Sequence, residues 1–122
     1  MVRTLARLLG VVFILVGILG FIPAAAPDGA LLGIFPVNAL HNIVHILLGL
    51  WGLGAAGSMA GAVSYMRSLT VIYALLAVLG LIPATQDLFG LVPLHGPDVW
   101  LHAGLAVVAA WAGFGPPSKA VA

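Results

Sequence analysis

The sequence predicts an all-α fold: a transmembrane four-helix bundle built from two parallel helix–loop–helix repeats. Three observations predict it, namely the apolar composition, the spacing of helix-breaking residues and an internal duplication. Of the 122 residues, 63% are hydrophobic and only 6% are charged, whereas a soluble domain carries about 25% charged residues. A chain with so few polar side chains cannot cover a surface that faces water, so an ordinary soluble protein is excluded.

Composition also narrows the partners and the chemistry. The net charge is +1 and there are only four basic residues, too few for the clustered phosphate contacts of nucleic-acid binding. With no cysteine, the chain forms neither disulfides nor thiolate metal clusters. No serine, lysine or pair of carboxylates is placed like a catalytic group. We therefore expect a protein embedded in the lipid bilayer, without enzymatic activity and without a nucleic-acid partner.

Four segments approach the length that a membrane-spanning helix needs, about 20 mostly apolar residues. In chain order they cover residues 5–22, 38–56, 63–82 and 98–114. Each has a proline at one edge, where a first helical turn or a helix end tolerates it; these are Pro23, Pro36, Pro83 and Pro97. We expect a single integral membrane domain over residues 1–122, ending in a frayed tail over residues 115–122.

The first segment resembles a secretory signal peptide. Arg3 and Arg7 precede or begin its apolar run, and three alanines at residues 24–26 follow it, as they would at a cleavage site. We interpret the segment as a retained helix because it has a counterpart in the second half of the chain.

The charged residues indicate the orientation of the segments. With four spans, all cations fall on one side of the membrane and all carboxylates on the other; the cations are Arg3, Arg7, Arg67 and Lys119, and the carboxylates are Asp28, Asp87 and Asp98. The positive-inside rule makes the cationic side cytoplasmic. We therefore expect both termini in the cytoplasm and all histidines on the outer side. Tyr65, near the cytoplasmic boundary, is typical of an interfacial anchor.

An internal duplication relates the two halves of the chain. Residues 7–11 align with 67–71, residues 19–23 with 79–83 and, after a gap in the loop, residues 33–36 with 90–93. The same register places His41 over Asp98 and His45 over His102. Because each repeat, about residues 5–56 and 63–114, contains an even number of spans, the repeats share one orientation.

The aligned polar residues form the candidate site. His41 and His45 are four residues apart near the start of the second segment, and Asp98 and His102 have the same spacing in the fourth, so each pair shares a helix face. Three imidazoles and one carboxylate suit zinc, copper(II) or iron(II), which predicts a metal site formed by His41, His45, Asp98 and His102. Alternatively, His45 and His102 are the axial ligands of a haem b held in the bundle. A further interpretation gives these residues only capping and headgroup contacts.

Other polar residues have simpler predicted roles. Asn38 is the expected N-cap of the second helix, and Asn42 orients a histidine or contacts another helix. His95 belongs to the second outer loop, and Tyr73 is one of the few polar groups near mid-depth in the third segment.

Two alternatives involve no metal. Gly49, Gly52 and Ala56 give the second segment a small-residue face that permits close helix contact within or between chains. This face favours a structural or interaction subunit without chemistry of its own, as a homo-oligomer or beside a membrane partner. The apolar outer loops, residues 31–35 and 88–92, instead allow a lipid- or quinone-binding protein, but no specific residue indicates such a ligand.

Two stretches of the chain resemble a known family. Residues 33–45 read GIFPVNALHNIVH and are followed by LGL at residues 48–50, and residues 98–102 read DVWLH. These motifs are similar to those of the bacterial four-span membrane proteins grouped as domain of unknown function 4383, over nearly the whole chain. Val99 stands where the family's second motif often has asparagine, which removes one side chain that would orient a ligand. The resemblance implies a multi-pass protein of the bacterial inner (cytoplasmic) membrane and assigns no activity.

Overall fold

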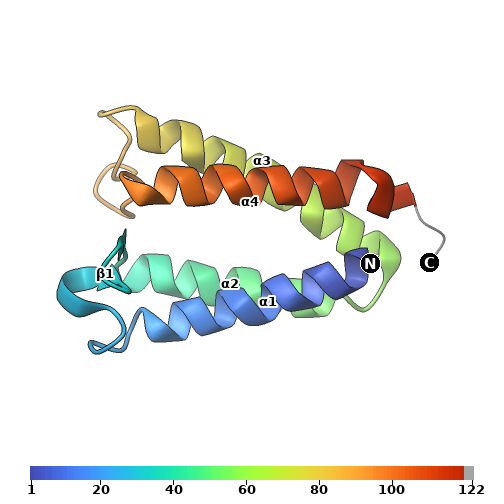
Figure 1. The fold of residues 1–122 in the computed structure, drawn as a ribbon, viewed down its shortest axis with the longest axis horizontal. Coiled ribbons are helices and arrows are strands. Elements are labelled where there is room, and N and C mark those ends of the chain that lie inside the picture. Colours follow the sequence, from blue (N-terminus) through green and yellow to red (C-terminus); the bar gives the residue numbers. More distant parts are fainter. Residues whose placement is uncertain (120–122) are drawn as a thin grey trace.

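The helices form two antiparallel hairpins that lie against each other (Figure 1). The computed structural model describes residues 1–119, and these fold into four α-helices: α1 (Val2–Leu19), α2 (Ala39–Ala55), α3 (Met59–Leu81) and α4 (Pro97–Phe114). α1 pairs with α2 and α3 with α4, and α3 also contacts both helices of the first hairpin. The N-terminus and the α2–α3 turn lie at one end of the bundle, and the two long loops lie at the other (Figure 1). The predicted all-α fold is confirmed.

Two helices differ from the predicted segments in where they begin or end. α1 begins three residues before the start of the predicted segment 5–22 and ends three residues before its end. It ends early because residues 20–22 form hydrogen-bonded turns instead of continuing the helix. α3 begins at Met59, four residues before its predicted start. The Ser58 hydroxyl accepts a hydrogen bond from the Gly61 N–H at 2.9 Å and so caps this earlier start. α2 and α4 begin and end within one residue of the predictions.

The first long loop contains three short elements. A 3-10 helix, η1 (Pro27–Gly29), leads into an antiparallel pair of two-residue strands, β1 (Ala30–Leu31) and β2 (Phe35–Pro36). The turn between the strands places Leu32 and Gly33 at φ of 56° and 72°, a left-handed conformation that glycine adopts without steric cost. β2 contacts α4 of the other hairpin.

The prediction of a frayed tail over residues 115–122 was wrong for its first part. Residues Pro116–Lys119 form a second 3-10 helix, η2, which buries Pro117. Residues 120–122 lie outside the described part of the chain.

Glycine residues bring the backbones of α1 and α2 into close contact. A Cβ atom at Gly49 would lie 2.5 Å from the Gly10 carbonyl oxygen, and one at Gly10 would lie 2.8 Å from the Gly49 carbonyl oxygen. A Cβ atom at Gly52 would likewise lie 3.0 Å from the Ala6 carbonyl oxygen of α1. The small-residue face predicted for α2 thus packs against α1 of the same chain.

A buried aromatic cluster joins the two hairpins. Phe13, Tyr65 and Tyr73 are each at most 4% exposed, and the rings of Phe13 and Tyr73 stack with centroids 5.9 Å apart. The Tyr65 hydroxyl donates a hydrogen bond to the Leu48 carbonyl at 2.8 Å, which ties α3 to α2. The prediction that Tyr65 is an interfacial anchor was wrong, because its ring is enclosed between the hairpins, with Trp51 packed edge-on against it.

The outer surface of the bundle is apolar. Each helix exposes large hydrophobic side chains, among them Leu8, Leu47, Leu75 and Val107. Within the described residues, three segments are long and apolar enough to cross a membrane, namely Val2–Leu19, Met59–Leu81 and Pro97–Lys119, and α2 is a shorter apolar helix. The chain is therefore a membrane protein whose apolar helices are compatible with a lipid bilayer.

Candidate functional site

The four predicted site residues come together at the loop end of the bundle. His41 and His45 lie on the first two turns of α2, and Asp98 and His102 on the first two turns of α4. All four are buried, with exposed fractions between 1% and 8%, and they line one cavity of about 190 Å³. We refer to His41, His45, Asp98 and His102 as the histidine cluster. The structure places residues of both hairpins in this one cluster.

The aromatic rings of the cluster and its neighbours are in contact. The ring centroids of His41 and His45 lie 4.4 Å apart on adjacent turns of α2, and those of His41 and His102 lie 6.4 Å apart across the two hairpins. The Tyr73 ring lies 5.2 Å from that of His102, and the Phe13 ring stacks on that of His45 at 6.0 Å. Each of the four helices therefore contributes at least one side chain to the site or its border.

Polar atoms of the cluster lack hydrogen bonds. Within residues 1–119, four atoms of the cluster are buried without a partner, as is the Tyr73 hydroxyl; the four are Nδ1 of His41, His45 and His102 and Oδ2 of Asp98. Buried polar groups are almost always paired, and an unpaired one costs about 1–3 kcal/mol. The cluster thus has unused capacity to bind a cation or a polar ligand. Helix capping does not give these unpaired atoms a partner, because α2 is capped by Asn38 and no side chain of the described residues caps α4.

A second cavity also borders the histidine rings. It encloses about 230 Å³ and touches His41, His45, His102 and Tyr73, with apolar walls from α2, α3 and the second loop. The cavity of about 190 Å³ has walls from α1, α4 and the first loop instead. The histidine rings therefore lie between two apolar spaces.

The side chains of the cluster do not form a complete metal site as they stand. In the part of the chain that the structure describes, no group of three or more His, Asp or Glu side chains is arranged to hold a metal ion. His41 and His45 come from adjacent turns of one helix, whereas the ring of His102 enters from the other hairpin and stays 6.4 Å from that of His41. The predicted ligands are thus gathered without converging on one point.

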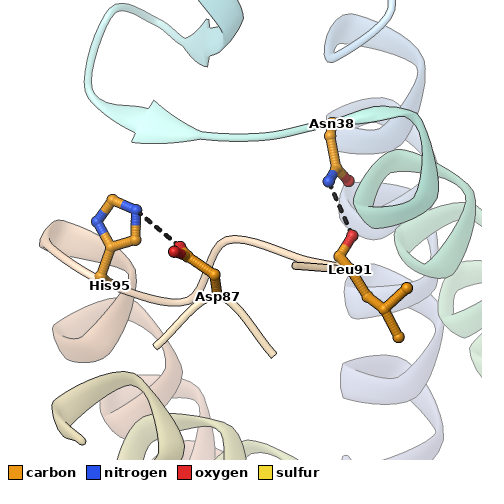
Figure 2. A network of polar contacts seen from close by, with 4 residues as sticks. All are labelled: Asn38, Asp87, Leu91 and His95. Carbon is orange, nitrogen blue, oxygen red and sulfur yellow. Dashed lines mark hydrogen bonds and ion pairs between the residues drawn. The ribbon is translucent and has the colours of Figure 1, made fainter. Parts of the chain in front are cut away.

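Asn38 fixes the start of α2 to the second loop (Figure 2). Its Oδ1 accepts a hydrogen bond from the His41 N–H at 2.8 Å, which confirms the predicted N-cap. Its Nδ2 donates a hydrogen bond to the Leu91 carbonyl at 2.9 Å. One side chain therefore links the helical turn that carries His41 to a loop of the other hairpin.

His95 lies outside the cluster, in the second loop as predicted. Its Nε2 is 3.2 Å from Oδ1 of Asp87 (Figure 2), and the two side chains are 45% and 54% exposed. Exposed ion pairs contribute at most about 1 kcal/mol to stability. His95 is therefore a suitable control in experiments on the buried histidines.

A match to a protein family covers most of the chain. Residues 3–115 match the model of the family described as Domain of unknown function (DUF4383). The chain belongs to this family. The resemblance of residues 33–50 and 98–102 to DUF4383 is thereby confirmed, and the family's description assigns no activity. No curated protein and no solved structure matches the chain.

One further side chain of this DUF4383 protein, that of Tyr73, lies at the site, and the sequence signal that marks it is weak. Tyr73 lies on α3, and only its polarity within an apolar helix distinguishes it. Asn42 is 2% exposed and packs against Gly20 at the end of α1, which agrees with the predicted contact to another helix. Val99 packs against Gly80 in the second hairpin.

Proposed function

We propose that this protein is a four-span protein of the bacterial cytoplasmic membrane that binds a transition-metal ion at the histidine cluster. The observation that carries the proposal is the burial of three imidazoles and one carboxyl group in one place with polar atoms unpaired. Imidazole nitrogen and carboxylate oxygen are ligands for zinc, copper(II) and iron(II). A bound cation would satisfy atoms that otherwise oppose folding.

The ring distances support coordination after small side-chain rotations. Two imidazoles that bind one tetrahedral ion, with nitrogen atoms about 2.0–2.1 Å from the metal, have ring centroids about 5 Å apart. The distances of 4.4 Å between His41 and His45 and of 6.4 Å between His41 and His102 lie on either side of this value. Histidines four residues apart on a helix also form the zinc-binding pair of other proteins. Both pairs that include His41 are therefore within about 1.5 Å of the ring separation that one tetrahedral ion requires.

Equivalent contacts support the proposal that the two hairpins are repeats. Gly20 packs against Asn42 in the first hairpin, and Gly80 against Val99 in the second. The alignment of the two halves pairs these same positions. The same register pairs the cluster residues of α2 with those of α4, so the proposed site uses corresponding positions of a duplicated unit.

A related pair of contacts occurs at the opposite end of the bundle. Arg3 Nε donates to the Ala56 carbonyl at 2.8 Å, and Arg67 Nε donates to the Gly113 carbonyl at 2.7 Å. Ala56 and Gly113 are aligned in the duplication. The arginines are offset by one helical turn, because the residue aligned with Arg67 is Arg7.

The proposed topology requires α2 to cross the membrane. Its 17 residues extend about 26 Å, near the lower limit for a hydrocarbon core of about 30 Å. Four spans would form one membrane domain of two repeats, residues 5–56 and 63–114, with both termini cytoplasmic and the histidine cluster near the outer surface. The cysteine-free chain allows a direct test with His95→Cys in the second loop and Ala60→Cys beside the α2–α3 turn. A membrane-impermeant maleimide should label His95→Cys on intact cells and label Ala60→Cys only after lysis; the opposite pattern would contradict the orientation.

Metal analysis of the purified protein tests the proposed site. Protein made without a histidine tag should retain one zinc, copper or iron ion per chain, measured by inductively coupled plasma mass spectrometry. The double variant His45→Ala/His102→Ala should lose the ion, whereas His95→Ala, which removes an exposed histidine, should keep it. A wild-type protein that binds none of these ions when they are added, and whose stability the double variant leaves unchanged, would rule out the metal site.

A haem b held by His45 and His102 is the second candidate ligand. A haem places one flat macrocycle between its two axial ligands, whereas the histidines here border two cavities of about 190 and 230 Å³. This arrangement favours an ion over a haem. The absorption spectrum of the same preparations separates the two, because a Soret band that disappears in the double variant would indicate haem.

A further inference from the structure

An open groove follows one face of α3, in the half of the helix that begins at the α2–α3 turn. Its volume is about 890 Å³. α3 residues that recur every four positions, among them Met59, Val63, Arg67 and Val71, form its floor, and Phe114 of α4 closes one side. Arg67 lies about 12 Å along α3 from Met59, and Val71 and Ile72 continue the groove beyond it toward the middle of the bundle. Apart from Arg67, these positions are apolar.

The end of α4 holds Arg67 in a defined place. Its Nε donates a hydrogen bond to the Gly113 carbonyl at 2.7 Å, and its guanidinium carbon lies 5.0 Å from the centroid of the Phe114 ring, a cation–π contact. Gly113 permits this approach, because a Cβ atom there would lie 2.9 Å from the Arg67 backbone nitrogen. The terminal nitrogens of Arg67 donate no hydrogen bond to any of residues 1–119. They are thus oriented and available to a ligand.

The charge of Arg67 has no carboxylate partner within the described residues. The three aspartates belong to the long loops and the first turn of α4, at the other end of the bundle. A planar guanidinium with two available terminal nitrogens matches the oxygens of a phosphate group in a bidentate manner. Ser64 and Ser68 also line the groove, and the Ser68 hydroxyl donates a hydrogen bond to the Ser64 carbonyl at 2.8 Å. The groove therefore combines an anion-binding group with an apolar floor.

We propose that this groove binds an anionic phospholipid, with the phosphate at Arg67 and an acyl chain along Val71 and Ile72, the apolar positions that follow Arg67 toward the middle of the bundle. The apolar walls are open to the bilayer, since Val71 is 65% exposed and Phe114 is 52% exposed. A headgroup with a net negative charge attracts the guanidinium of Arg67. A zwitterionic headgroup attracts it less, because the cationic group of that headgroup offsets the charge of its phosphate. The proposal does not depend on a metal at the histidine cluster.

Lipid retention by the full-length protein tests the proposal. The protein is reconstituted with equal amounts of phosphatidylglycerol and phosphatidylcholine, extracted in mild detergent and analysed by native mass spectrometry. The wild-type protein should retain phosphatidylglycerol selectively, and Arg67→Gln should weaken this binding about ten-fold, because a charge-assisted contact is lost. Arg7→Gln is the matched control, since Arg7 is exposed, lies outside the groove and aligns with Arg67 in the duplication. Equal retention of both lipids by the wild type, or equal losses in the two variants, would overturn the proposal.

A second variant separates loss of the lipid from loss of the fold. Arg67→Gln also removes the hydrogen bond to Gly113, whereas Ser64→Trp keeps Arg67 and fills the groove from an exposed position. Ser64→Trp should keep the wild-type melting temperature and lose the bound phosphatidylglycerol; retention at the wild-type level would refute the proposed site. Soluble glycerol phosphate should not displace the lipid, because it has no acyl chain to lie along the apolar floor. Displacement would assign the groove to free phosphate and would also refute the proposal.

Discussion

The imidazole rings of His41 and His102 lie with their centroids 6.4 Å apart, although the two residues belong to different helical hairpins. This approach depends on the packing of α3, which contacts both helices of the first hairpin as well as α4. Tertiary packing therefore creates the cluster. The unpaired nitrogen atoms of the two rings oppose that packing unless a ligand binds them, so stability and ligand binding are linked at this site.

Replacing His102 with phenylalanine should separate the cost of burial from the benefit of binding. His102 is 1% exposed and its Nδ1 is unpaired, and the larger ring can extend into the cavity of about 230 Å³ beside it. In metal-free protein, His102→Phe should leave the free energy of unfolding unchanged or raise it by up to about 1–3 kcal/mol. Zinc should raise the melting temperature of the wild type and not that of the variant, because a ligand that binds only the folded state stabilises it.

Differential scanning fluorimetry with added zinc and with a chelator measures both effects of His102→Phe. His95→Ala is the control and should respond to zinc as the wild type does, since His95 pairs with Asp87 at the surface. If zinc raises the melting temperature of His102→Phe as much as that of the wild type, His102 is not a ligand.

Asn38→Ala should lower the free energy of unfolding by about 1–2 kcal/mol, because it removes the N-cap of α2 and the bond to the second loop. Asn38→Asp keeps an acceptor for the His41 N–H but has no donor for the Leu91 carbonyl. Hydrogen exchange measured by mass spectrometry should therefore show a less protected first turn of α2 only in Asn38→Ala. Equal deprotection in both variants would contradict the capping role.

The helix boundaries that were predicted correctly depend on local signals. α2 begins after the Asn38 cap and α4 begins at Pro97, and both residues act within a single turn. The start of α3 was missed because the segment was taken from apolar residues alone, whereas the Ser58 hydroxyl caps the helix earlier. The end of α1 was missed because residues 20–22 are apolar like the helix and yet form turns.

Helical spacing and the alignment of the two halves predicted that the four residues of the histidine cluster would lie together, but their neighbours were not predictable. Helical spacing and alignment together identified His41, His45, Asp98 and His102 as one group. Apolar residues occupy every face of α3, so no periodic pattern shows which face turns inward, and the burial of Tyr65 and Tyr73 follows only from how the hairpins cross. Side-chain rotamers decide whether ligands converge on one point, and spacing along a helix does not determine them.

Two glycines of α2 should respond in opposite ways to alanine. A Cβ atom at Gly49 would lie 2.5 Å from the Gly10 carbonyl oxygen, so Gly49→Ala should force α1 and α2 apart and lower the free energy of unfolding by about 1–3 kcal/mol. A Cβ atom at Gly54 would have no neighbour within 4 Å. Gly54→Ala should therefore raise the free energy of unfolding by about 0.5–1 kcal/mol, because alanine is more stable than glycine within a helix. Unfolding in detergent with increasing denaturant measures both; a stabilising Gly49→Ala would contradict the close backbone contact.

Gly49 also distinguishes a contact within the chain from a contact between chains. Because Gly49 packs against Gly10 of the same chain, Gly49→Leu should lower the melting temperature without changing the oligomeric state. Size-exclusion chromatography with light scattering measures that state. A change in mass that the histidine variants do not produce would favour the interaction-subunit alternative.

The two buried tyrosines of α3 should respond differently to loss of the hydroxyl group. The Tyr65 hydroxyl donates to the Leu48 carbonyl at 2.8 Å, so Tyr65→Phe should lower the free energy of unfolding by about 0.5–1.5 kcal/mol. The Tyr73 hydroxyl is buried without a partner among the described residues, so Tyr73→Phe should leave the stability of metal-free protein unchanged or raise it. Both substitutions keep the ring and its packing, and parallel unfolding curves compare them directly. If Tyr73→Phe lowers the free energy of unfolding as much as Tyr65→Phe does, the Tyr73 hydroxyl has a hydrogen-bond partner in the folded protein. The histidine cluster would then have one fewer unpaired polar group beside it.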